Sequence, residues 1–118
     1  MLKEINAYNV YLACGATDLR KSINGLAVCI QESFQLDPFS KCLFVFCNRR
    51  KDKIKILQWE STGFWLHYKR LEKGAFKWPS TSQGKTLNVD ERQLRWLLDG
   101  LSLEQADAHR PIEERIII

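Results

Sequence analysis

Basic side chains are concentrated in the middle of the chain, and such a group of cations is suited to binding an anion. Residues 41–85 carry eleven Lys or Arg side chains and three Asp or Glu side chains, a net charge of +8. Residues 1–40 have a net charge of −1, and residues 86–118 have a net charge of −3. The positive field of the middle segment would steer an anionic partner toward it.

Catalytic chemistry finds little support in the sequence. HExxH, GxSxG, Walker-type and kinase-type patterns are absent. Most carboxylates fall at expected helix caps, turns and strand ends, where they are ordinary. A Cys/His nucleophile pair is the remaining alternative, with His67 as the only central histidine. A lone histidine is usually structural, so the sequence predicts that the protein is not an enzyme.

The cysteines do not form a recognised metal or redox motif. The chain has four of them without CxxC spacing, namely Cys14, Cys29, Cys42 and Cys47. On one regular strand, Cys42 and Cys47 would point to opposite faces. A zinc site would need His67 or His109 at a spacing that no known site uses. We therefore expect buried thiols, no metal and no cofactor.

The elements that position the basic segment follow from hydrophobic periodicity. Residues 10–13 predict a short strand, after which Thr17 or Asp18 can cap a helix. Apolar residues recur at helical spacing from Leu19 to Phe34. The helix should end before Pro38, because the residue that precedes a proline disfavours the α conformation.

The segment after Pro38 changes to the period of strands. A continuous apolar run over 43–47 is typical of a strand that is covered on both faces. Polar residues 48–52 predict a turn. Further strands are expected over 53–60, 64–71 and 75–78. With turns at 61–63 and 72–74, these segments predict a four-strand antiparallel meander.

A second helix and a tail complete the predicted fold. Asn88 and Glu91 have capping-box spacing, and leucines form a stripe that ends at Leu101, after a polar linker over 80–85. The fold class is therefore α+β: a short N-terminal strand, a helix, the meander and a C-terminal helix. We expect one domain over residues 1–102. Residues 103–118 form a C-terminal tail, and its sequence does not indicate whether the apolar end packs on the domain.

Neither membrane insertion nor secretion is indicated. No run of apolar residues approaches the roughly 18 that a membrane span requires, and the first ten residues lack the pattern of a signal peptide. We expect a cytoplasmic protein.

Turn length decides which side chains share a face of the meander. With three-residue turns, Lys55 would face Lys69, which would face Lys77, and Trp59 would face Trp65 on the same side. The opposite side would provide the floor for the first helix, through Ile54, Ile56, Leu66, Tyr68, Phe76 and Trp78. A two-residue turn would exchange the faces.

A row of lysines on one sheet face suggests phosphate binding, because like charges opposite each other are destabilising unless an anion neutralises them. The candidate phosphate contacts are Arg49, Arg50, Lys51, Lys53, Lys55, Lys69, Arg70 and Lys77. Trp59 and Trp65 could stack on unpaired bases or form a partner surface. Alternatively, the lysines only keep a solvent-facing sheet soluble, and the tryptophans lie under the second helix.

Several motifs in a fixed order resemble one known family. They are VYLACGATDLRKSINGLA, LDPFSKCLFVFCNRRKDKIKILQWE, GFWLHYKRLEKGAFKWP and QLRWLLDGL. Together they extend from about Val10 to Leu101. This part of the chain resembles the small TnpB-type accessory proteins of bacterial insertion sequences related to insertion sequence 66.

The resemblance implies a role in DNA transposition of the element. Its expected partners are the separate DDE-type transposase, a second small accessory protein, and DNA at the ends of the element or at the target. Two hypotheses follow. The protein binds DNA through its basic face and turn, or it is an adaptor that binds and positions the transposase without direct DNA contact.

Overall fold

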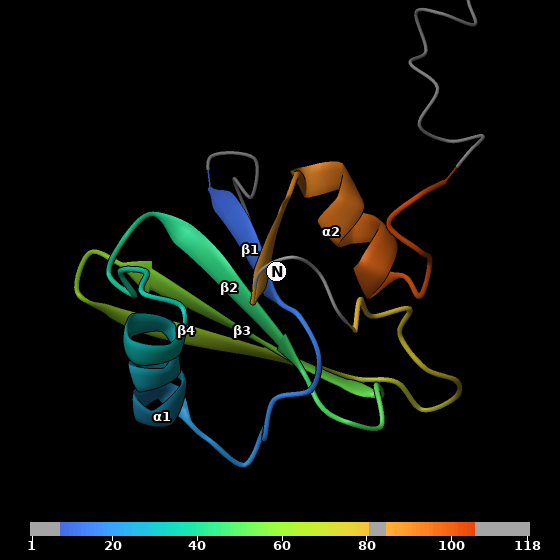
Figure 1. Cartoon of the computed structure of the whole chain (residues 1–118), viewed down its shortest axis with the longest axis horizontal. Coiled ribbons are helices and arrows are strands. Elements are labelled where there is room, and N and C mark those ends of the chain that lie inside the picture. The colour runs from blue at the N-terminus through green and yellow to red at the C-terminus, as the bar shows by residue number, and fades with distance from the viewer. Residues whose placement is uncertain (1–7, 81–84, 106–118) are drawn as a thin grey trace, which may run out of the picture.

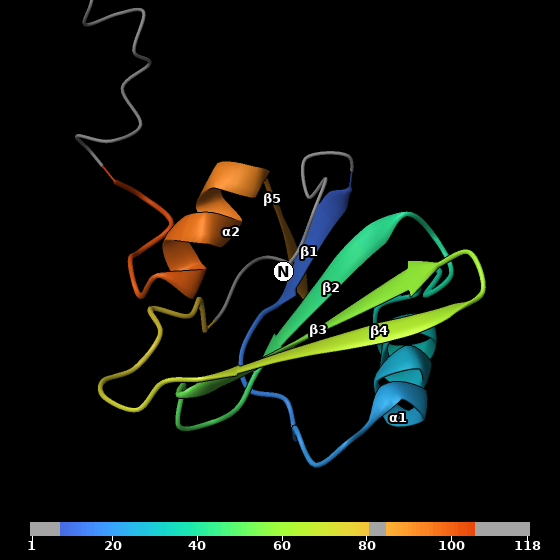
Figure 2. The same ribbon diagram turned by 180° about the vertical axis from the view of Figure 1, so that it is seen from behind.

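A five-stranded mixed sheet lies between two helical elements in the computed structural model, which describes residues 8–80 and 85–105. The sheet order is β4-β3-β2-β1-β5. Figures 1 and 2 show α1 over the β3 and β4 side of the sheet and α2 near β1 and β5. The elements in chain order are β1 (Asn9–Ala13), α1 (Ile23–Val28), η2 (Cys29–Ser33), β2 (Cys42–Cys47), β3 (Lys53–Glu60), β4 (Gly63–Arg70), β5 (Thr86–Val89) and α2 (Glu91–Leu98).

The central strand β2 confirms the prediction from its continuous apolar run. All six of its residues are buried, because helical elements or irregular segments cover both sheet faces. The predicted first strand is also present, as β1, and it pairs in parallel with β2. Parallel neighbours need a long crossover connection, which α1 and η2 provide here.

The first helix starts later than predicted. Its N-cap is Ser22 rather than Thr17 or Asp18. The Thr17 N–H donates to the Cys47 carbonyl at 2.8 Å, and the Asp18 carboxylate accepts from the Arg20 N–H at 3.0 Å. These contacts hold residues 16–21 as a loop against the end of β2, so the helix cannot begin there.

The predicted four-strand meander is wrong in its last strand. β2, β3 and β4 do form an antiparallel meander, but residues 75–78 follow Gly74, at φ +82°, and are irregular. The Phe76 N–H donates to the Lys51 carbonyl at 2.7 Å, and the Trp78 Nε1–H donates to the Ala13 carbonyl at 3.0 Å. The fifth strand is instead β5, which is antiparallel to β1.

The predicted face assignment is also wrong, because the β3–β4 turn has two residues. Glu60 pairs with Gly63, so that only Ser61 and Thr62 lie between the strands. Lys55 therefore pairs with Tyr68 instead of Lys69. A one-residue change in turn length reverses every side chain of one strand relative to the other. The row of Lys55, Lys69 and Lys77 does not exist.

Two hydrophobic clusters fill the two sides of the sheet. Leu26 and Ile30 pack with Phe44, Phe46 and Leu57 on the α1 side. The α2 side holds the larger cluster, which includes Leu12, Val45, Leu94 and Leu97. The predicted floor for the first helix divides between the sides: Leu66 packs with α1, but the other cluster takes Ile54, Ile56, Phe76 and Trp78.

The second helix is confirmed as α2, but its cap differs from the prediction. Asp90 is the N-cap and forms a capping box with Gln93, whereas Asn88 lies in β5. Leu103 packs against the cluster on the α2 side. Residues 81–84 of the predicted linker and 106–118 of the predicted tail lie outside the described residues. No helix in the described part of the chain is long and apolar enough to cross a membrane.

Candidate nucleic-acid interface

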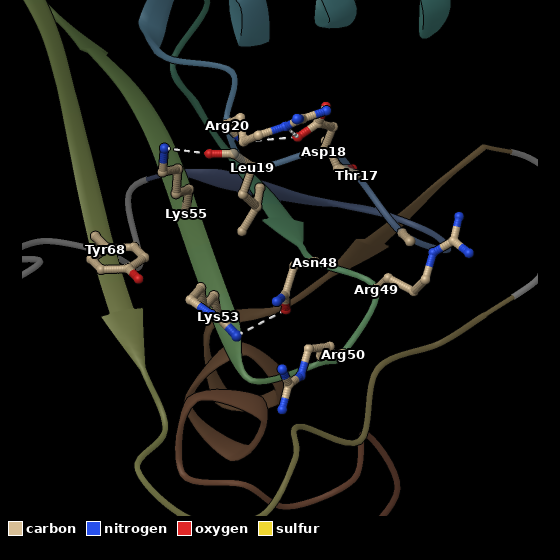
Figure 3. A pocket seen from close by; sticks show the side chains of 11 residues that line it. Thr17, Asp18, Leu19, Arg20, Asn48, Arg49, Arg50, Lys53, Lys55 and Tyr68 are labelled. Carbon is tan, nitrogen blue, oxygen red and sulfur yellow. Dashed lines mark hydrogen bonds and ion pairs between the residues drawn. The ribbon is translucent and has the colours of Figure 1, made fainter.

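An open pocket of about 890 Å³ lies where the 48–52 turn, β3, β4 and the loop over 16–20 meet. Figure 3 shows Tyr68 of β4 on one side, the two turn arginines on the other, and the lysines of β3 between them. The cations that line it are Arg20, Arg49, Arg50, Lys53 and Lys55. Asp18 is the one carboxylate among the described lining residues. This pocket is referred to below as the basic pocket.

The turn that carries the arginines is held by the side chain of Asn48. Its Oδ1 accepts from the backbone N–H groups of Asp52 at 3.1 Å and Lys53 at 3.0 Å. Its Nδ2 donates to the Asp52 carboxylate at 2.7 Å, and this bond is the main cause that lowers the pKa of Asp52. Lys51 adopts φ 62° within the turn. The arginines therefore project from a backbone whose shape is already fixed.

The loop over 16–20 contributes a paired charge. Arg20 Nη2 lies 2.8 Å from Asp18 Oδ2, and Arg20 Nε lies 3.0 Å from Asp18 Oδ1. These hydrogen bonds lower the pKa of the Asp18 carboxyl well below its ordinary value. Arg20 is nevertheless highly exposed, with 91% of its side chain accessible. Its guanidinium can still meet an anion, although Asp18 offsets much of its charge.

Most of the other cations that line the basic pocket are not neutralised by a carboxylate. Lys55 Nζ donates to the carbonyls of Leu19 at 2.7 Å and Lys21 at 3.1 Å, so its ammonium is oriented without being neutralised. Lys53 Nζ is 3.5 Å from the Asp52 carboxylate. Arg49 and Arg50 are exposed, and neither forms an ion pair within residues 8–80 and 85–105. Such an arrangement suits the oxygens of a phosphate, which guanidinium groups bind bidentately.

Four of the predicted phosphate contacts lie outside the basic pocket, namely Lys51, Lys69, Arg70 and Lys77. Lys69 points to the α2 side, where its Nζ donates to the Leu98 carbonyl at 2.6 Å. Arg70 is bonded to Glu72 at 2.9 Å. Lys77 is exposed on the irregular segment after Gly74. Lys51 is half-buried in the turn and does not line the pocket.

The two predicted stacking residues occupy opposite faces of the sheet, because Trp59 pairs with Phe64 and Trp65 pairs with Gln58. The Trp59 ring contacts Phe64 with centroids 5.0 Å apart. Trp65 is 56% exposed and donates from Nε1 to the Glu60 carboxylate. The prediction that Trp59 and Trp65 share one surface is therefore wrong.

The groups considered for nucleophilic chemistry are not arranged for it. Burial raises the pKa of the Cys47 thiol to about 12, so the thiol stays protonated at neutral pH and is a poor nucleophile. The His67 ring is half-buried, burial lowers its pKa, and Nε2 lies 2.8 Å from the Gln58 amide oxygen. Within the described residues, no three His, Cys, Asp or Glu side chains are grouped to hold a metal ion.

Comparison with known families decides where the chain belongs. The model of the family described as IS66 Orf2 like protein matches residues 8–108, which contain both the loop and the turn of the basic pocket. The chain belongs to the IS66 Orf2-like family. Membership implies an accessory role in transposition, as the resemblance of the motifs predicted.

Two relatives of the same length range come from Sinorhizobium fredii (strain NBRC 101917 / NGR234). The uncharacterized protein y4hO is 36% identical over 101 residues, which cover 86% of this chain and 87% of that protein. The uncharacterized protein y4jC is 28% identical over 101 residues, which cover 86% of each chain. No solved structure matches this IS66 Orf2-like chain significantly.

Two residues of the basic pocket were missed by reasoning from this IS66 Orf2-like sequence. Arg20 falls within the helix that was expected after Thr17 or Asp18, but it lies in the loop before α1. Tyr68 was expected in the core, but it is 54% exposed beside Lys55. The TDLRK motif was a usable signal for Arg20, because Asp and Arg two residues apart can form a local turn. For Tyr68, only the correct turn length would have sufficed.

Proposed function

We propose that the protein is a DNA-binding accessory factor of transposition that holds DNA phosphates in its basic pocket. In this proposal it acts together with the transposase of the element and a second small accessory protein. The observation that carries the proposal is the convergence of five cations from the loop, the turn and β3 around one pocket with a single lining carboxylate. For a protein with an accessory role in transposition, DNA is the anionic partner expected at such a surface.

The pocket has the physical properties that phosphate binding requires. Arg49 and Arg50 are exposed and form no ion pair with a described carboxylate, so binding does not have to break one. Arg50 interacts with Asp52 only through a longer-range electrostatic attraction. Asn48 fixes the turn, which lowers the conformational entropy that is lost on binding. Each phosphate that a cation neutralises also releases condensed counterions, which favours association at low salt.

The test measures binding to fluorescein-labelled DNA from the ends of the element. Fluorescence anisotropy should show that Arg49→Ala/Arg50→Ala binds at least about tenfold more weakly than the unmodified protein, since hydrogen bonds to charged groups contribute about 1.5–3 kcal/mol each. The matched control is Lys73→Ala/Arg92→Ala, which removes the same charge from two exposed sites outside the pocket. If both double variants lose affinity equally, the net charge is responsible and the pocket is not the binding site.

The adaptor hypothesis also has an observation in its favour. Phe39 is 55% exposed and packs on Trp59 and Phe64, with ring centroids 5.0 Å and 5.4 Å away. This exposed aromatic cluster could contact the transposase, because aromatic side chains are enriched where proteins bind each other. Copurification from cells that lack the DNA of the element separates the hypotheses. Transposase capture that is lost in Phe39→Ala and retained in Arg49→Glu/Arg50→Glu would favour the adaptor.

A further inference from the structure

We infer that the basic pocket takes an unpaired nucleotide of single-stranded DNA, with the phosphate on the cations and the base against the ring of Tyr68. This inference rests on the proposed DNA-binding function and specifies the form of the DNA. It comes from the shape of the pocket and from the one aromatic side chain among its described lining residues.

Tyr68 is placed to present a ring to the pocket. It pairs with Lys55 across β3 and β4, so both side chains emerge on the same face of the sheet. Tyr68 is 54% exposed, and β4, which carries it, lies at the edge of the sheet. In Figure 3, Tyr68 stands across the lysines of β3 from Arg49 and Arg50. A nucleotide with its base on the Tyr68 ring and its phosphate near the cations would span the pocket in this direction.

The size of the pocket is that of a site for a small organic group. Its volume of about 890 Å³ falls within the roughly 300–1,000 Å³ of typical ligand pockets. Bases of single strands are free to enter such a recess, and stacking on an aromatic ring is tolerant of sequence. In a duplex the bases are paired and stacked inside, so only the backbone could approach the rim.

Neither helix is placed to read a duplex groove. Reading the major groove by a helix requires several basic or amide side chains along one protruding face. α1 has six residues, and Leu26 is buried against the sheet. On the exposed side of α2, Arg95 is paired with Glu91 at 2.9 Å, and the helix is followed by Asp99. Arg92 is then the one basic side chain of α2 without an ion pair to a described carboxylate, which is fewer than groove reading requires. Within the described chain, the pocket is therefore the better route to bases.

Fluorescence anisotropy tests the inference with one oligonucleotide of about twenty nucleotides, used as a single strand and as a duplex. The single strand should bind at least about fivefold more tightly than the duplex, which is the lower end of what one stacked base contributes. Tyr68→Thr should lower single-strand affinity by about fivefold or more and leave duplex affinity unchanged. Tyr68→Phe should restore it, because the ring rather than the hydroxyl carries the contact.

The outcomes separate this inference from the function on which it rests. Equal affinity for single strand and duplex, or full single-strand affinity in Tyr68→Thr, overturns the inference while DNA binding stands. No binding of either form, by a protein whose unfolding curve is normal, overturns both. Threonine suits an exposed strand position, and an equal unfolding midpoint for Tyr68→Thr and Tyr68→Phe would confirm that lost affinity reflects the ring.

Discussion

Replacing Asn48 by alanine should loosen the turn that presents Arg49 and Arg50. The substitution removes the two bonds from the Asp52 and Lys53 backbone N–H groups to Asn48 Oδ1, at 3.1 Å and 3.0 Å. Each such bond contributes about 1 kcal/mol net, so the free energy of unfolding should fall by about 2 kcal/mol. The further bond to the Asp52 carboxylate adds little to this figure, since that carboxylate can be solvated instead.

Urea unfolding followed by tryptophan fluorescence measures this change. The control is Asn24→Ala: Asn24 is exposed in α1 and has no hydrogen bond from its side chain to another described residue, and alanine is the better helix former. Asn48→Ala should also weaken DNA binding at temperatures where the variant is fully folded. Stability and affinity that both equal those of the unmodified protein would refute the idea that Asn48 organises the turn.

Three further predictions concern the scaffold and its response to pH. Leu97→Ala should cost about 2–5 kcal/mol in urea unfolding, because Leu97 is fully buried on the inner face of α2; a loss below about 1 kcal/mol would mean that α2 does not anchor there. Asp90→Ala should cost about 1 kcal/mol, with Asp90→Asn retaining most of the stability, since the capping bond to Gln93 is lost only in the first. Arg20 keeps the pKa of Asp18 below its value in the unfolded chain. The ion pair between them therefore contributes fully to stability above about pH 4, and its contribution is lost as the pH falls toward the folded pKa. Asp18→Asn should make stability less dependent on pH in acid unfolding curves, and an unchanged curve would contradict this.

Strands with a strong local signal were predictable from the sequence alone. The apolar run over 43–47 and the alternation after Lys53 have no other good interpretation, and both became strands. The leucines of α2 were equally clear. Each of these patterns reflects the burial of a single segment. It therefore identifies the helix or strand correctly even where the arrangement of the elements is predicted wrongly.

Arrangement depended on contacts between distant residues and was predicted less well. The register of β3 and β4 depends on the length of the turn between them, and one residue of difference changes it. Gly63 was assigned to the turn because glycine is common in turns, whereas it is the first residue of β4. β5 has four residues and is defined by its pairing with β1. The segment 75–78 alternates like a strand, but Phe76 and Trp78 are instead buried below α2 by an irregular backbone.

The site was therefore half predictable. Arg49 and Arg50 belong to one turn and Lys53 begins the strand that follows it, so their proximity follows from sequence. Arg20 joins them because its loop is held there by the Thr17 N–H bond to the Cys47 carbonyl and by the bonds from Lys55 Nζ to the Leu19 and Lys21 carbonyls. These contacts join segments at least thirty residues apart, and no local pattern encodes them.

The salt dependence of DNA affinity tests the central claim most directly. For each phosphate contact that is lost, the slope of log affinity against log salt should become shallower by about 0.9 for duplex or about 0.7 for single strands. Arg49→Ala/Arg50→Ala should therefore reduce the slope by about 1.4 on single strands, and Lys73→Ala/Arg92→Ala should leave it nearly unchanged. An unchanged slope in the Arg49/Arg50 variant would show that the basic pocket does not hold the phosphates.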